Sequence, residues 1–64
     1  MGYWYDVYVN DDQEPFNRDE YLTKEQAYDL AESLYDDGWS VCVIKMVDGE
    51  EVWRGYWPLD GMMK

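Results

Sequence analysis

The chain has 64 residues, and its 15 acidic residues face 5 basic ones, which gives a net charge of −10. This excess disfavours direct binding to nucleic-acid phosphates, which need Lys and Arg, and it disfavours attraction to anionic membranes. A chain this short builds one small core without a deep enclosed pocket, so we expect one domain whose function lies on its outer surface.

The first predicted element is a strand over residues 3–9. Aromatic and β-branched residues there alternate with a period of two, which is typical of a strand. Residues 10–20 are polar and include Pro15, so they are expected to form a loop. A short extra strand within this loop is an alternative that the sequence leaves open.

A helix is predicted to begin at Thr23. The side chains of Thr23 and Gln26 have the spacing of a capping box, in which each accepts a hydrogen bond from the other's backbone N–H. The apolar residues that follow have the i, i+3, i+4, i+7 spacing of a buried stripe. They are Ala27, Leu30, Ala31 and Leu34. Gly38 fits the left-handed position just after a helix end.

Two further strands are predicted over residues 39–47 and 50–57, joined at Asp48-Gly49, a strong signal for a two-residue hairpin turn. This turn predicts the register of the hairpin. The pairs are Val47 with Glu50, Met46 with Glu51, Lys45 with Val52, Ile44 with Trp53, Val43 with Arg54, and Cys42 with Gly55. The face expected to pack under the helix carries Cys42, Ile44, Met46 and Trp53.

The predicted fold class is therefore α+β, with the order β–α–β–β in a single domain spanning residues 1–64. One helix packs on an antiparallel sheet of three to four strands. The tail 59–64 has no predicted element and is a candidate for a flexible end.

Residue types that commonly carry catalysis are scarce. The chain has no His, which is the commonest general base and zinc ligand, so its single cysteine, Cys42, has no His to activate it. The acidic run 10–14 lacks the Gly and the distal Glu of a calcium loop. We expect no enzyme activity, no cofactor and no metal. The lone cysteine and the lack of a signal peptide or membrane span predict a cytoplasmic protein.

Acidic residues form a row along the predicted helix. At about 100° per residue, four of them fall in a sector of about 60° opposite the buried stripe, over roughly 16 Å. This helix stripe consists of Glu25, Asp29, Glu32 and Asp36. Its spacing resembles that of DNA phosphates, ~3.4 Å apart along one strand. Together with Asp11, Asp12 and Asp37, the stripe is the predicted contact for a basic groove. The alternative is a merely solvated face.

Aromatic residues make up 19% of the chain, and they suggest a second contact surface. A three-stranded sheet under one helix leaves one face uncovered, and exposed Tyr and Trp are frequent anchors of interfaces. The alternative interface consists of Tyr8, Val43, Tyr56 and Trp57. It would suit a small structural or assembly protein that docks or forms a homodimer. These residues could also belong to an aromatic-rich core.

The stretch from Lys24 to Tyr35, followed by Gly38-Trp39-Ser40-Val41, resembles small phage early proteins. Over residues 22–47 the layout is most similar to the phage T7-type inhibitor of bacterial RNA polymerase, where a valine-rich strand follows the helix. That family has arginines in this strand, whereas this chain has Val43 and Lys45. The resemblance implies a phage host-takeover protein that occupies the surface of a host protein.

We therefore predict a non-enzymatic, phage-encoded inhibitor acting in the cytoplasm of the host bacterium. Its partner is expected to be a host protein with a basic, nucleic-acid-binding surface, such as a CRISPR, restriction or RNA polymerase component. The protein would bind it in the style of anti-CRISPR and anti-restriction DNA mimics. We expect no direct contact with nucleic acid or membrane.

Overall fold

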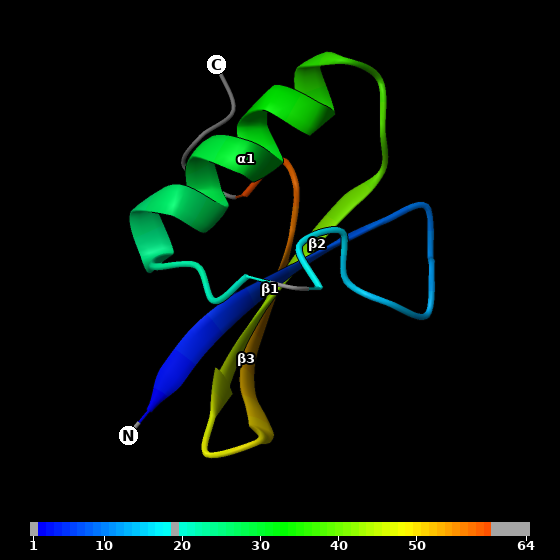
Figure 1. Cartoon of the computed structure of the whole chain (residues 1–64). Coiled ribbons are helices and arrows are strands. Elements are labelled where there is room, and N and C mark those ends of the chain that lie inside the picture. The colour runs from blue at the N-terminus through cyan, green and yellow to red at the C-terminus, as the bar shows by residue number, and fades with distance from the viewer. Residues whose placement is uncertain (1, 19, 60–64) are drawn as a thin grey trace.

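A computed structural model describes residues 2–18 and 20–59, with one helix packed on one face of a three-stranded antiparallel sheet (Figure 1). The elements are β1 (Tyr3–Val9), α1 (Lys24–Asp36), β2 (Val41–Val47) and β3 (Glu50–Tyr56). β2 is central, and β1 and β3 flank it. This confirms the predicted α+β fold and its β–α–β–β order. Within the described ranges the sheet has three strands.

The helix forms as its end signals predicted. The Thr23 hydroxyl accepts a hydrogen bond from the backbone N–H of Gln26 at 3.2 Å, and the Thr23 backbone N–H donates to Gln26 Oε1 at 3.0 Å. At the other end, Gly38 has a φ of 99°, and the Trp39 N–H donates to the Leu34 carbonyl at 3.1 Å. The Gly38 N–H also donates to the Tyr35 carbonyl at 3.0 Å. These two bonds form a Schellman motif, which satisfies carbonyls in the last turn of the helix.

The first loop contains no extra strand among its described residues, but it closes the outer edge of β1. Asn17 is buried; its Oδ1 accepts from the Val7 N–H at 2.8 Å, and its Nδ2 donates to the Tyr5 carbonyl at 3.1 Å. The Phe16 N–H donates to the Val7 carbonyl at 2.6 Å, and the Tyr5 N–H donates to the Leu22 carbonyl at 3.1 Å. The loop thus satisfies backbone groups that an edge strand would expose.

The predicted hairpin turn is confirmed, but most of the predicted register is wrong. Asp48 and Gly49 have φ values of 52° and 87°, as a type I′ turn requires. The two pairs nearest the turn form as predicted. A β-bulge then adds Val52 to β3, because Lys45 pairs with Trp53. The remaining pairs shift by one residue: Ile44 with Arg54, Val43 with Gly55, and Cys42 with Tyr56.

The opposite face of β2 packs under the helix, so the predicted assignment of Cys42, Ile44 and Met46 to that face is wrong. The core joins alternate residues of β1 and β2, namely Tyr5, Val7, Val9, Val41 and Val43, to Ala27, Ala31 and Leu34 of α1. The small alanines let the helix approach the valines closely. Leu30, predicted to be buried, is only partly buried.

Trp53 does lie on the helix side of the sheet, because the bulge turns it there. Its ring stacks on Tyr28 at 6.3 Å between centroids. Gly55 leaves space for this ring, since a Cβ at Gly55 would lie 2.5 Å from Trp53 Cη2 and 2.7 Å from Leu59 Cδ2. The position therefore requires glycine for steric reasons.

Candidate protein-binding surfaces

The helix stripe is exposed along its whole length. Glu25, Asp29, Glu32 and Asp36 all face solvent, whereas Ala27 is fully buried on the other side of the helix. Among the described residues, the ion pairs are Arg18–Glu14 and Arg54–Glu51, and neither involves the stripe. The negative charge of the helix is therefore not compensated by these pairs.

The two described lysines lie over aromatic rings. Lys24 Nζ is 5.5 Å from the centroid of Tyr28, and Lys45 Nζ is 5.1 Å from that of Tyr3. Both lysines line a hollow of about 360 Å³ together with Tyr5, Tyr28, Val52 and Trp53. These cation–π contacts hold the lysines beside the tyrosines and not along the stripe.

The seven predicted acidic residues belong to two surfaces. Asp37 is exposed just after the stripe, at the C-terminal end of α1. Asp11 and Asp12 instead line a hollow on the sheet face that α1 does not cover, which we call the open face. The Asn10 N–H donates to the Ser40 carbonyl at 2.8 Å and ties their turn to the chain just before β2. The structure thus separates Asp11 and Asp12 from the helix stripe.

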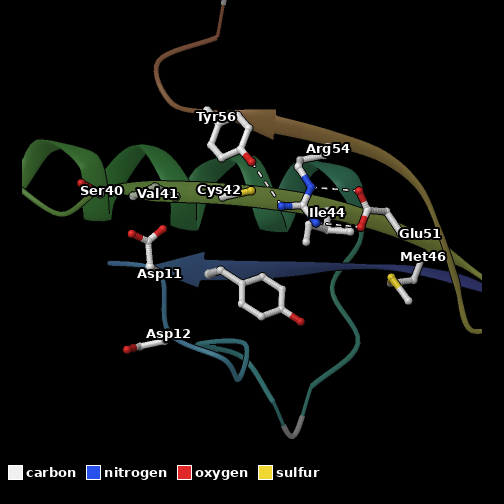
Figure 2. A pocket seen from close by; sticks show the side chains of 11 residues that line it. Asp11, Asp12, Ser40, Val41, Cys42, Ile44, Met46, Glu51, Arg54 and Tyr56 are labelled. Carbon is white, nitrogen blue, oxygen red and sulfur yellow. Dashed lines mark hydrogen bonds and ion pairs between the residues drawn. The ribbon is translucent and has the colours of Figure 1, made fainter.

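The open-face hollow has a volume of about 450 Å³ (Figure 2). Its floor is formed by β2, and its sides come from β1 and β3. The lining side chains from these strands are Tyr8, Val41, Cys42, Ile44, Met46, Glu51, Arg54 and Tyr56, with Ser40 beside Asp11 and Asp12. Although no helix covers this face, Ile44 is only 8% exposed, so neighbouring side chains shield the floor.

An ion pair borders the hollow on the β3 side. Arg54 Nε and Nη2 donate to the two carboxylate oxygens of Glu51 at 2.9 and 2.8 Å, and Arg54 Nη1 donates to the Tyr56 hydroxyl at 3.2 Å (Figure 2). The hydrogen bonds from Arg54 lower the pKa of Glu51, and those with Glu51 and Tyr56 raise the pKa of Arg54. Both groups therefore stay charged and neutralise each other at neutral pH.

The β-bulge makes this ion pair geometrically feasible. In a regular strand, side chains three positions apart point to opposite faces. Glu51 pairs with Met46 and Arg54 pairs with Ile44, so the extra residue Val52 brings both charges to the open face. The predicted register had no bulge and placed Glu51 and Arg54 on opposite faces, so this ion pair was not predicted.

Burial raises the pKa of three titratable groups of the open face, namely Cys42, Asp6 and Tyr8. Burial raises the pKa of the Cys42 thiol, with Arg54 acting in the opposite direction. Burial also raises the pKa of Asp6, although a hydrogen bond from Trp4 opposes the shift. Cys42 is thus held as the neutral thiol, which is a weaker nucleophile than the thiolate.

Two of the four residues predicted to form the alternative interface lie on the open face, and the other two are buried. Val43 is 0% exposed and Trp57 is 8% exposed, because both pack in the core beneath α1. The ring of Trp57 makes an edge-to-face contact with Tyr28 at 5.0 Å between centroids. Tyr8 is half-buried and Tyr56 is 62% exposed; these two line the open-face hollow.

The described residues contain no group of three or more His, Cys, Asp or Glu placed to hold a metal ion. Within residues 2–18 and 20–59, no helix has the length and apolar character needed to cross a membrane. Comparison of the chain with protein-family models, with curated proteins and with solved structures finds no match.

Proposed function

We propose that this protein is a non-enzymatic inhibitor that covers a basic, nucleic-acid-binding surface of another protein with its helix stripe. The observation that carries the proposal is a row of four exposed carboxylates that no ion pair of the described residues neutralises. A basic groove would supply the missing cations, and such contacts speed association and fix orientation.

The stripe has a stability cost that favours a binding role. Glu25 and Asp29, like Glu32 and Asp36, are spaced i, i+4, and each like-charge pair destabilises a helix by about 0.2–0.5 kcal/mol. The last turn of α1 contains no basic residue, so Asp36 lies unfavourably at the negative end of the helix dipole. Lys or Arg in place of Asp36 would make a more stable helix, because a cation is favoured in the last turn.

The nature of the target follows from the same chemistry. A row of carboxylates at intervals of three or four helical residues rises ~4.5–6 Å per charge, which is comparable to the phosphate spacing of a nucleic-acid strand. The proposed target is therefore a host CRISPR, restriction or RNA polymerase component. The resemblance to small phage early proteins supports a phage origin.

The test compares two variants that change the net charge equally. The stripe-neutral variant carries E25Q, D29N, E32Q and D36N. The control variant carries E14Q, E20Q, D48N and E50Q, which are exposed acidic residues outside both candidate surfaces.

Wild-type protein immobilised on beads should capture a nucleic-acid-binding protein from bacterial lysate, and added salt or duplex DNA should release it. The stripe-neutral variant should lose at least tenfold in affinity for the captured protein, and the control variant should retain most of it. Capture that resists both salt and DNA, or that survives neutralisation of the stripe, would refute the proposal.

The open face supports a second candidate function, a small assembly protein that docks through an apolar surface. The observation in its favour is the exposed ring of Tyr56 beside the apolar lining of the hollow. This function predicts association that is insensitive to salt and weakened by Tyr56→Ala. Sedimentation of the wild-type protein and of Tyr56→Ala at low and high salt separates this assembly function from the stripe-based function.

A further inference from the structure

We propose that the open-face hollow receives a Lys or Arg side chain from a partner protein, with its apolar stem over the floor and its charged head at Asp11 and Asp12. This goes beyond the proposed function, because the hollow lies on the face of the sheet opposite α1 and acts separately from the helix stripe.

The charged side chains around the hollow determine which sign of charge an occupant must carry. Four charged side chains line it, and two of them, Glu51 and Arg54, neutralise each other. Asp11 and Asp12 are exposed, and no ion pair among the described residues involves them. The hollow therefore has an uncompensated negative end and favours a cation.

The acidic end is held in place by its backbone. Asn10 and Asp11 have φ values of 53° and 62°, and the Asp12 N–H donates to the Val9 carbonyl at 3.0 Å. These features define a type I′ turn, which the side chain of Asn10 anchors by accepting from the Ser40 N–H at 3.2 Å. The two carboxylates thus lie on a turn that hydrogen bonds to Ser40 hold in place.

The floor of the hollow is apolar, and this defines the shape of the side chain that could occupy it. Cys42, Ile44 and Met46 supply the floor, and the ring of Tyr56 is positioned by the bond from Arg54 to its hydroxyl (Figure 2). Lys and Arg carry long apolar stems that pack on such surfaces while the charged head stays in water.

Other occupants fit less well. A phosphate or carboxylate would meet two carboxylates at one end and an arginine already paired with Glu51 at the other. A second copy of the chain would bring another net charge of −10. A basic side chain beside an apolar residue, carried by a partner protein, matches both the charge and the lining.

The probe is an acetylated and amidated leucine–arginine–leucine peptide, with the same peptide containing neutral citrulline as its control. Titration into isotope-labelled full-length protein, followed by amide NMR, should shift resonances of the turn and the floor of the hollow. The citrulline peptide should bind at least fivefold more weakly.

Two variants with equal charge change locate the effect. D11N/D12N should weaken arginine-peptide binding about fivefold, as expected for two exposed charge contacts, whereas D48N/E50Q at the hairpin turn should not. Asn is chosen at Asp11 because it tolerates positive φ. The stripe-neutral variant should retain shifts at the hollow, which separates this site from the proposed function.

The inference would be overturned by equal binding of the citrulline peptide, by unchanged binding of the arginine peptide to D11N/D12N, or by shifts confined to the helix. The absence of any binding at millimolar peptide would also overturn it. Dimerisation through the open face, detected by sedimentation, would assign the hollow to a second copy instead.

Discussion

Neutralising the helix stripe should make the protein more stable. The stripe-neutral variant removes two i, i+4 repulsions and one i, i+3 repulsion, each worth about 0.2–0.5 kcal/mol. It also removes Asp36 from the negative end of the helix dipole, but it loses the favourable Glu25 of the first turn, and these two effects of about 0.3–1 kcal/mol largely cancel. Gln and Asn have nearly the helix propensities of Glu and Asp. The net expected gain is about 0.6–1.5 kcal/mol.

Urea denaturation followed by circular dichroism measures this gain at low salt. For a domain of this size, about 1 kcal/mol corresponds to a rise of roughly 4–8 °C in Tm. The gain should shrink at high salt, because salt screens repulsion between exposed charges. The control variant should gain less, since its four positions are not neighbours on one helix and E14Q removes the ion pair with Arg18. If the stripe-neutral variant is no more stable than the wild type at low salt, or if salt leaves its gain in stability unchanged, the helix stripe does not destabilise the fold by charge repulsion.

Three further predictions concern stability and ionisation. Gly55→Ala should destabilise the fold by about 1–3 kcal/mol, as overpacking does, and by less in a Trp53→Ala background, which a double-mutant cycle of unfolding free energies would measure. Asn17→Ala should cost about 2–4 kcal/mol in the same assay, because it strands buried backbone groups of β1. Arg54→Met should return the pKa of Glu51 upward to the ordinary range, as measured by carboxyl NMR titration.

Each of these three predictions can be contradicted by a specific result. An equal cost of the added methyl group in both backgrounds would show that the Trp53 ring does not occupy the space. A loss below 0.5 kcal/mol for Asn17→Ala would mean that the loop does not support β1. Because the pKa of Glu51 is lowered in the folded protein, its ion pair stabilises the fold at pH values above the ordinary carboxyl pKa. This stabilisation is lost as the pH falls through the lowered pKa. An unchanged pKa in Arg54→Met would contradict the pairing.

The local signals of this sequence predicted its elements well. β1, the capping box at Thr23 and the turn at Asp48 depend on neighbouring residues alone, and all three are confirmed. The helix stripe followed from helical periodicity, which needs no knowledge of tertiary contacts.

The choice of sheet face could not be predicted in this way. Both faces of β2 are apolar, with Val41 and Val43 on one side and Ile44 on the other, so alternation does not distinguish them. The bulge at Val52 has no clear sequence signal, although it decides which face carries Arg54. The open-face hollow depends on this register and on the path of the first loop, and it was missed for that reason.

The hydrogen bonds from the first loop to β1 occupy one of the two edges of the sheet. β1 is bonded to β2 on one side and to the loop on the other. Among residues 2–18 and 20–59, the backbone bonds of β3 outside its ladder do not reach its outer edge. Within these described residues, the outer edge of β3 is therefore the place where a strand from another molecule could add. Two copies paired through β3 would each have this edge occupied, so sheet extension among the described strands would end at a closed pair and not continue into a fibre.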